Sequence, residues 1–301
     1  MGDRLLPRPR TAGSSLVPEM TRSRFSAPLP PLNSAHILRK YGLRADKSLG
    51  QNFLQDTYAL EKIVAISGIL PTDTVLEIGP GLGALTRHLA AAAGQVIAVE
   101  LDERLFPPLK EVISGWTNIT LIQGDILKLT PADIVPVTDY LVVANIPYYI
   151  TSALLRHLLE TNPRPRRVVL TIQKEVAERI CAKPGDMSLL ALSVQVYGQP
   201  AIAAMIPAEA FHPAPKVDSA IVRIDLTPAP FIPASLLDTF FSLARAGFSQ
   251  KRKTLRNSLS AGMRKTPAEM ETLLRSAGID PKRRAETLSL EEWRELTARM
   301  T

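Results

Sequence analysis

Between residues 73 and 180, short runs of aliphatic and β-branched residues alternate with segments whose apolar residues recur at helical spacing. The strand-like runs are "DTVLEIG", "QVIAVELD", "ITLIQGDIL", "DYLVVANIP" and "RRVVLTIQ", and helical segments such as "TSALLRHLLE" separate most of them. Strands that alternate with helices in this way predict a parallel sheet covered by helices on both faces. The central part of the chain is therefore expected to be an α/β fold.

The flanking segments divide the chain into three parts. Residues 1–33 hold six prolines and no apolar periodicity, which predicts a disordered tail and disfavours the amphipathic helix of a transit peptide. Two further strand-like runs, "SLLALSVQVYGQP" and "SAIVRIDL", precede a proline-rich hinge at residues 228–233, after which every segment has helical spacing. We therefore expect an α/β domain over residues 34–227 and a small all-helical domain over residues 228–301.

Charge is distributed unevenly along the chain. Residues 1–33 carry +3 (5 Arg, 2 acidic), residues 34–244 carry −2 (18 basic, 20 acidic) and residues 245–301 carry +6 (13 basic, 7 acidic). A basic surplus beside a nearly neutral body indicates a polyanionic partner that docks at one end, although a solvated basic face has the same composition.

Composition argues against several classes of site. The longest apolar runs are far shorter than the roughly 18 residues that a membrane span requires. The single cysteine, Cys181, excludes an internal disulfide and a multi-cysteine zinc site, and the four histidines show no metal-ligand spacing. We expect neither a membrane segment nor a metal.

The segment "VLEIGPGLG" places three glycines, Gly79, Gly81 and Gly83, directly after a strand and before a helix. Glycine permits a tight turn and lets the backbone approach a ligand closely. The spacing differs from the G-x-G-x-x-G that seats a pyrophosphate, and Glu77 lies two residues before the first glycine. This combination favours a cofactor with an amino acid and a sulfonium over one with phosphates.

Polar residues end the next three strands as well. Glu100 can accept both hydroxyls of a ribose, Asp125 can accept from an adenine amino group, and Asn145 ends the fourth strand. Open α/β sheets bind ligands at the carboxyl edge, where these strand ends meet. One acid alone could be a helix cap or a surface charge, but the ordered set with Gly79 fits S-adenosylmethionine.

Seven motifs together resemble a known family, the ribosomal RNA adenine dimethyltransferases, specifically the KsgA/RsmA type that acts on small-subunit rRNA. The motifs are "SLGQNFLQD", "VLEIGPGLGALT", "VIAVELD", "GDIL", "NIPYYIT", "FHPAPKVDSAIVRI" and "RAGFSQKRKTLRNSL", and the resemblance runs from about residue 35 to the C-terminus. It implies a Rossmann-like class I methyltransferase domain, a helical rRNA-binding C-terminal domain and S-adenosylmethionine as methyl donor. It further implies methylation of N6 on two adjacent adenines in the 3′-terminal hairpin of 16S rRNA, within a pre-ribosomal small subunit, by a cytoplasmic monomer.

The resemblance also implies roles for single residues. By motif position, the residues expected to contact the cofactor or the target site are Asn52, Leu54, Gly79, Gly81, Glu100, Asp125 and Asn145.

The "NIPY" motif suggests how the target is activated. The Asn145 side-chain oxygen and the Ile146 carbonyl can accept hydrogen bonds from the two N–H groups of an adenine amine. The nitrogen lone pair then points towards the sulfonium methyl group of the cofactor. Pro147 makes this segment rigid, and Tyr148 offers a face on which the base can stack. Phe211 is a candidate for a second packing surface on the base, or else a core residue.

Four basic residues of "SQKRKTLRNSL" are candidates for contacts to rRNA phosphates: Lys251, Arg252, Lys253 and Arg256. A solvated helix face is the alternative for any one of them.

Three other functions are open from the sequence. An Erm-type large-subunit rRNA adenine methyltransferase has the same fold and chemistry, and a non-catalytic RNA- or DNA-binding protein could keep the fold. A DNA adenine methyltransferase usually has D/N-P-P-Y, and Ile146 at the first proline position favours RNA.

Overall fold

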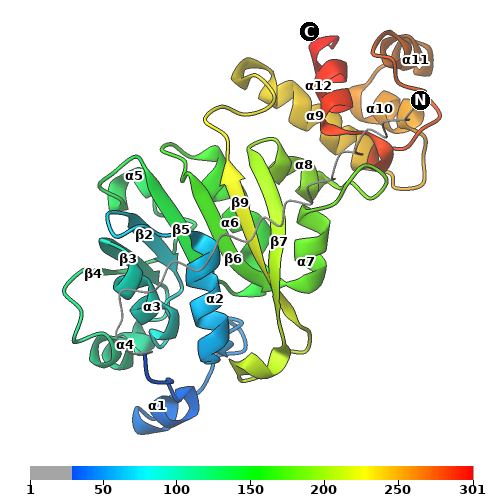
Figure 1. Cartoon of the computed structure of the whole chain (residues 1–301). Coiled ribbons are helices and arrows are strands. Elements are labelled where there is room, and N and C mark those ends of the chain that lie inside the picture. The colour runs from blue at the N-terminus through cyan, green and yellow to red at the C-terminus, as the bar shows by residue number, and fades with distance from the viewer. Residues whose placement is uncertain (1–28, 301) are drawn as a thin grey trace, which may run out of the picture.

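The computed structural model describes residues 29–300. A seven-stranded sheet with helices on both faces forms its centre (Figure 1). In chain order its strands are β2 (Thr74–Ile78), β3 (Gln95–Glu100), β4 (Ile119–Gln123), β5 (Tyr140–Asn145), β6 (Arg167–Gln173), β7 (Gly198–Ile206) and β9 (Ser219–Leu226).

The strand order is β4-β3-β2-β5-β6-β9-β7, and the first five strands in that order are parallel. The chain adds β3 and β4 on one side of β2 and then returns to place β5 on the other side. The direction of winding therefore reverses between β2 and β5. Open α/β sheets bind ligands outside the carboxyl ends of their strands at such a switch point. The predicted α/β fold with a Rossmann-like sheet is confirmed.

Consecutive residues of the central strands point to opposite faces of the sheet, because side chains alternate along a strand. In β5, Leu141 joins an apolar cluster with α2 (Thr57–Ser67) and α3 (Ala84–Ala92). Its neighbour Val142 joins a second cluster with α6 (Thr151–Glu160) on the opposite face. Burial on both faces explains why these strands read as continuous apolar runs.

The far edge of the sheet differs from the prediction. β9 runs antiparallel to β6, and β7 runs antiparallel to β9 at the edge, where Pro200 needs no ladder partner for its missing N–H. The run "SLLALSVQVYGQP" was predicted as a strand, and this prediction is wrong. It forms helix α8 (Leu189–Gln195), with Ser188 as N-cap, and β7 begins only at Gly198. Periodicity alone does not separate a short buried helix from a buried strand.

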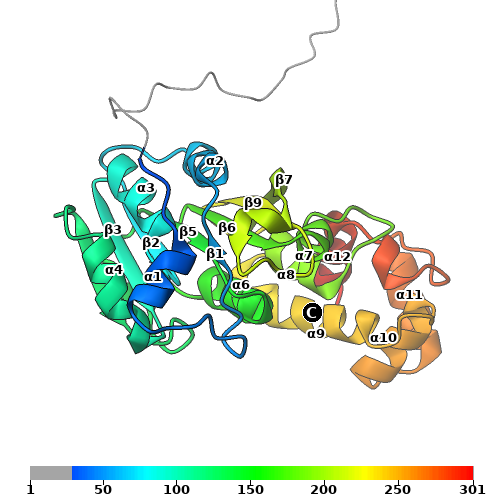
Figure 2. The ribbon, with the colours of Figure 1, turned by 90° about the horizontal axis from the view of Figure 1, so that it is seen from below.

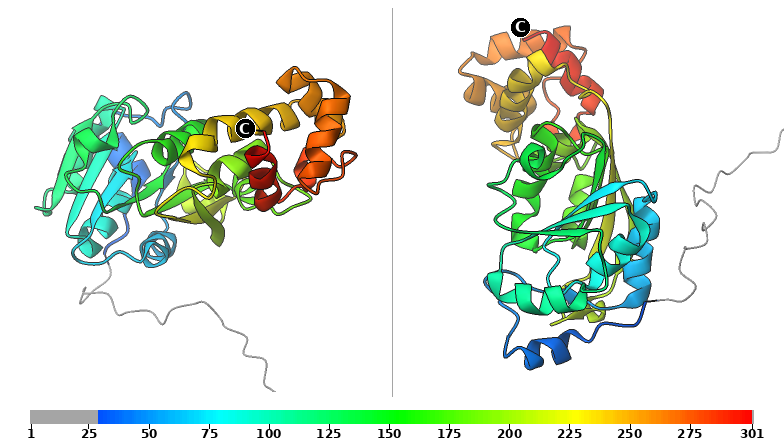
Figure 3. Two further views of the ribbon diagram at one scale, coloured as in Figure 1. Left: turned by 90° about the horizontal axis from the view of Figure 1, so that it is seen from above. Right: turned by 90° about the vertical axis from the view of Figure 1, so that its left-hand side faces the viewer.

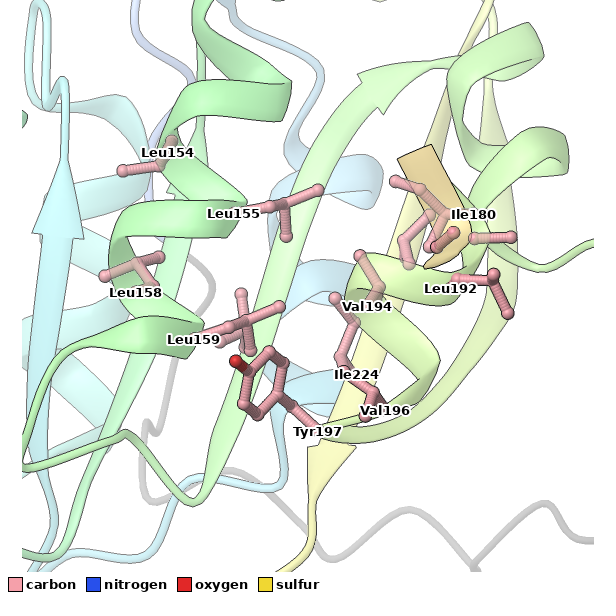
Figure 4. Packing of buried hydrophobic residues seen from close by; sticks show 14 of the residues in the cluster. Leu154, Leu155, Leu158, Leu159, Ile180, Leu192, Val194, Val196, Tyr197 and Ile224 are labelled. Atoms are coloured by element: carbon pink, nitrogen blue, oxygen red, sulfur yellow. The ribbon is translucent and has the colours of Figure 1, made fainter. Parts of the chain in front are cut away.

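Helices α6, α7 (Lys174–Ile180) and α8 cover one face of the sheet. Figure 4 shows Leu159 of α6, Val194 of α8 and Ile224 of β9 gathered in one cluster. Two short helices, α4 (Phe106–Val112) and α5 (Pro131–Ile134), complete the connections between the parallel strands.

The chain after residue 233 is helical, as the periodicity predicts. Its helices are α9 (Leu237–Phe248), α10 (Leu255–Met263), α11 (Pro267–Ser276) and α12 (Leu290–Ala298). Phe240 and Trp293 of this part belong to the same buried cluster as Val194. One apolar cluster thus spans both parts of the chain. We propose the domain boundary near residue 228 from the change to wholly helical structure after residue 233. The right-hand view of Figure 3 shows these helices at one end of the molecule and the N-terminal helix at the other.

That N-terminal helix, α1 (Ser34–Lys40), leads into a segment that crosses the carboxyl edge of the sheet (Figure 2). The segment ends in β1 (Phe53–Leu54), which pairs with β8 (Phe211–His212) in a small antiparallel sheet. We call residues 46–54 the strap.

Most of the predicted tail, residues 1–28, lies outside the described residues. Residues 29–33 do not behave as a tail, because they contact the folded chain. The Arg87 guanidinium donates to the Pro30 carbonyl at 3.0 Å, Leu32 packs against the core, and Asn33 caps α1.

No helix within residues 29–300 combines the length and the apolar character that a membrane crossing requires.

Candidate active site

A cavity opens at the carboxyl ends of β2, β3 and β5, at the switch point of the sheet. The segments that follow β2, β3, β4 and β5 line it together with the strap and Phe211. The cavity brings together every cofactor and catalytic candidate predicted from the sequence. These lining residues are Asn52, Leu54, Gly79, Gly81, Glu100, Asp125, Asn145, Ile146, Pro147, Tyr148 and Phe211.

The glycine turn after β2 forms one wall. Gly79 and Gly81 have φ values of 68° and 58°, which side chains disfavour. A Cβ on Gly79 would meet no atom within 4 Å, whereas a Cβ on Gly81 would lie 3.0 Å from the Phe53 ring. Gly79 therefore leaves its backbone accessible, and Gly81 permits the strap to pack against the turn.

Glu100 is a buried carboxylate at the end of β3. Its Oε2 accepts the Gly81 N–H at 2.9 Å, and its Oε1 accepts the Asp102 N–H at 2.9 Å. Burial raises the pKa of Glu100, and these backbone donors act in the opposite direction. Each oxygen keeps a lone pair that can accept from a hydroxyl of a ligand.

Glu77 lies beneath the glycine turn and is 1% exposed. Among the described residues, its Oε2 has no hydrogen-bond partner. Burial raises the pKa of Glu77 to about 8, which favours the neutral acid near pH 7. A cation placed in the cavity would favour the ionised form, because opposite charge stabilises a carboxylate.

Asp125 follows β4 at the edge of the cavity. Its Oδ1 accepts the Leu127 N–H at 3.1 Å, and Lys128 Nζ lies 3.7 Å from its Oδ2. This local turn keeps the half-buried carboxylate beside the cavity.

Asn145 ends β5 with an amide whose orientation is set by the strap. Its Nδ2 donates to the Asn52 carbonyl at 3.2 Å. Because the amide nitrogen is used in this bond, the side-chain oxygen is available as an acceptor. The next residue, Ile146, has a buried side chain.

The Tyr148 hydroxyl has a hydrogen-bond partner, Ser219, that the sequence analysis did not identify. Its hydroxyl lies 2.7 Å from Oγ of Ser219, a fully buried residue at the start of β9. Burial raises the pKa of Tyr148, so the phenol is neutral at physiological pH. Phe211 is 3% exposed and belongs to the core cluster that contains Leu54, yet it also lines the cavity. Phe211 is therefore a core residue and also part of the cavity wall, where a target base could pack against it.

A cluster of polar side chains fastens the strap to β3. Arg104 pairs with Asp102 at 2.7 Å and with Asp46 of the strap at 2.9 Å. Gln51 Nε2 donates to Asp102 Oδ2 at 2.8 Å, and Gln51 Oε1 accepts the Asp46 N–H at 2.8 Å. We call Asp46, Gln51, Asp102 and Arg104 the clasp. Asp102 and Arg104 lie two positions apart in "LDER", but nothing in the sequence pairs them with Asp46.

The predicted RNA-binding residues lie far from this cavity. Lys251, Arg252 and Lys253 are exposed in the turn between α9 and α10, which belongs to the end of the molecule opposite α1 (Figure 3). Arg256 forms an ion pair with Glu271 of α11 at 2.9 Å, so its charge is partly compensated.

Within residues 29–300, no group of three or more His, Cys, Asp or Glu side chains could hold a metal ion.

Comparison with known proteins gives a consistent result. The profile of the family described as "Ribosomal RNA adenine dimethylase" matches residues 42–301. A relative from Dehalococcoides mccartyi (strain CBDB1) is 50% identical over 272 residues, which cover 90% of this chain and 94% of the relative. One from Bacillus cytotoxicus is 42% identical over 273 residues, which cover 87% and 94%. Both are named "Ribosomal RNA small subunit methyltransferase A".

Two solved structures extend the comparison. The 23S rRNA methyltransferase ErmE superposes with a TM-score of 0.68 at 31% identity, covering 82% of this chain and 99% of that one. A dimethyladenosine transferase from Plasmodium falciparum gives a TM-score of 0.70 at 28% identity, covering 81% and 95%.

Proposed function

The chain belongs to the family of ribosomal RNA adenine dimethylases, and on that premise we propose that it dimethylates N6 of two adjacent adenines in the 3′-terminal hairpin of small-subunit rRNA. It is an S-adenosylmethionine-dependent methyltransferase that acts on ribosomal RNA. The relatives at 42–50% identity are named for the small subunit, which favours that substrate over the large-subunit rRNA of the more distant ErmE. In this proposal the enzyme is a cytoplasmic monomer that meets the rRNA within a pre-ribosomal small subunit.

The cavity suits S-adenosylmethionine, which supplies an electrophilic methyl group on a sulfonium. Gly79 leaves its backbone open to the ligand, and the buried Glu100 carboxylate has acceptor capacity for the ribose hydroxyls. Asp125 accepts from the amino group of the cofactor's adenine. Glu77 lines the same cavity, its Oε2 has no hydrogen-bond partner among the described residues, and its carboxylate would pair with the positively charged end of the cofactor. Asn52, Leu54 and Gly81 complete the wall on the strap side.

Asn145 and Ile146 activate the target amine. The lone pair of an adenine amine is delocalised into the ring, which makes the nitrogen a poor nucleophile. The Asn145 oxygen and the Ile146 carbonyl accept hydrogen bonds from its two N–H groups. These bonds favour a tetrahedral nitrogen with a localised lone pair. Because the Asn52 carbonyl already orients the Asn145 amide, this acceptor needs no reorganisation during the reaction.

The aromatic residues hold the target base after it leaves its stack. Tyr148 stacks on the base, Pro147 makes the loop rigid, and Phe211 packs against the base from the β8 side. After the first transfer the nitrogen keeps one N–H, and the proton that it loses passes to water.

The observation that carries this proposal is the Asn145 amide, whose nitrogen is held by the Asn52 carbonyl; among residues 29–300 its oxygen has no partner and lies beside the cavity. A non-catalytic protein of this fold has no need of that orientation. The alternative Erm-type activity uses the same chemistry, so only the identity of the RNA distinguishes it.

The test is transfer of labelled methyl to under-methylated small ribosomal subunits, with the modified bases mapped. Asn145→Ala should lower the rate by about 100-fold or more while the Kd for S-adenosylmethionine stays within a few-fold of wild type. Thr72→Ala, at an exposed position in the turn before β2, is the control and should retain activity. Label only on large-subunit rRNA would establish the Erm-type activity, and no label on either RNA would establish a binding protein.

A further inference from the structure

Tyr149 differs sharply from its neighbour Tyr148. Tyr148 points inward to Ser219, whereas Tyr149 is 60% exposed and lies at the rim of the same cavity. Among the described residues, no hydrogen bond is made by the Tyr149 hydroxyl. An exposed aromatic ring at the mouth of a binding cavity offers a face to a ligand that the cavity does not enclose.

The strap supports this ring from one side. A Cβ on Gly50 would lie 3.4 Å from Cδ1 of Tyr149 and 3.3 Å from Cβ of Pro147, so the glycine backbone packs closely against both residues. Gly50 is itself held, because its N–H donates to the Lys47 carbonyl and its carbonyl accepts from the Asn52 side chain, both at 3.1 Å. One side of the ring therefore rests against a fixed backbone, and much of the rest of the ring is exposed.

The chemistry of the site indicates what this ring would bind. When one base of an RNA strand enters the cavity, the sugar–phosphate backbone keeps the next base at its mouth. Aromatic side chains bind such unstacked bases by stacking. The proposed substrate has two adjacent adenines, so the base that waits at the mouth is itself a target.

We propose that Tyr149 is a stacking site for the base next to the one in the cavity, and that it holds the second adenine while the first is methylated. This inference rests on the proposed function. It makes Tyr149 a binding residue for the RNA, with no role in the cofactor site or in activation of the amine.

The test compares Tyr149→Phe with Tyr149→Leu, because Leu keeps an apolar side chain but has no ring face. With under-methylated small subunits as substrate, Tyr149→Leu should raise the KM for subunits by about fivefold or more. This is the smallest change in affinity expected when one base–aromatic stack is lost. It should also increase the share of subunits in which only one adenine is dimethylated. Tyr149→Phe should behave as wild type, and both variants should keep the wild-type Kd for S-adenosylmethionine.

A second comparison tests whether the effect of the Tyr149 ring depends on the neighbouring base. Subunits are prepared in which uridine, a weaker stacking base, replaces one adenine of the pair, on each side in turn. For the wild-type enzyme one of these replacements should raise the KM at the remaining adenine, and for Tyr149→Leu the same replacement should cause no further rise.

The outcomes separate the two proposals. Wild-type KM and product pattern in Tyr149→Leu would overturn the stacking site while the proposed function stands. An equal loss in Tyr149→Phe and Tyr149→Leu would also overturn it, because the hydroxyl would then be the contact. If the wild-type enzyme labels no small subunits, the proposed function and this inference both fall.

Discussion

The hydroxyls of Tyr148 and Ser219 lie 2.7 Å apart and join the loop after β5 to the buried start of β9. Ser219 is fully buried, and its only side-chain partner among the described residues is Tyr148. A buried hydroxyl pair of this kind restricts the orientation of the tyrosine ring. Ser219 is therefore a positioning residue, since it acts on the target base only through Tyr148.

We predict that Ser219→Ala and Tyr148→Phe each lower kcat/KM by about two- to tenfold, because each removes the same hydrogen bond. The double variant should be no worse than the more impaired single variant, since the bond can be lost only once. The measurement is methyl transfer to small subunits for all four proteins, with the Kd for S-adenosylmethionine as a check on the cavity. Additive losses would show that the two hydroxyls act independently.

Residue types at strand ends were well predicted from the sequence. Gly79, Glu100, Asp125 and Asn145 lie together because parallel strands end at one edge. Their partners were not predicted. The Asn52 carbonyl that orients Asn145 lies 93 positions away in the chain, and Ser219 lies 71 positions from Tyr148.

At the scale of elements, the strap is the segment that completes the site. It has almost no regular structure of its own, and two residues of β1 pair with two residues of β8. The clasp and this short ladder keep Asn52 against Asn145. Only the packing of this segment against β8 and the residues that follow β3 shows that it covers a cavity.

We predict that Arg104→Ala weakens binding of S-adenosylmethionine by at least about fivefold, because the clasp loses two charge-assisted partners and the strap loses its fixed position. Lys40→Ala is the matched control, since it removes an exposed ion pair with Glu111 that ties α1 to α4 away from the cavity. Its effect should be small, as is usual for exposed pairs. Calorimetric Kd values for both variants measure the difference, and equal Kd values would contradict the role of the clasp.

The run around Leu189–Gln195 illustrates the limit of pattern reading at this scale. Its apolar residues fit a strand and a helix equally well over such a short length. The Ser188 cap and the packing of Leu192 and Val194 against the α6 side of the sheet determine the helix.

For the whole molecule, the position of the charge matters more than its amount. The exposed cations at residues 251–253 lie at the end opposite the strap, so an RNA that reaches the cavity and this turn together must extend along the molecule (Figure 3).

We predict that reversing Lys251 and Arg252 to Glu lowers the affinity for small subunits and reduces the slope of log K against log salt by roughly 1 to 2, because phosphate contacts release counterions. The control reverses Arg179 and Lys183, two exposed cations near α7, which changes the net charge equally. Binding measured over a range of salt concentrations separates the two variants. If the control changes the slope as much as the test variant, net charge and not a local contact explains the binding.

Sequence alone determined the alternation of strands and helices, the helical C-terminal part and the residue types that end the parallel strands, because these depend on periodicity and on neighbours within a few positions. Tertiary structure alone decided that the strap covers the cavity, that Ser219 holds Tyr148, and that the basic turn lies at the far end. These features depend on contacts between residues far apart in the chain, such as the 58 positions between Asp46 and Arg104. Such contacts form only when the packed sheet brings distant segments together, and no local pattern encodes them.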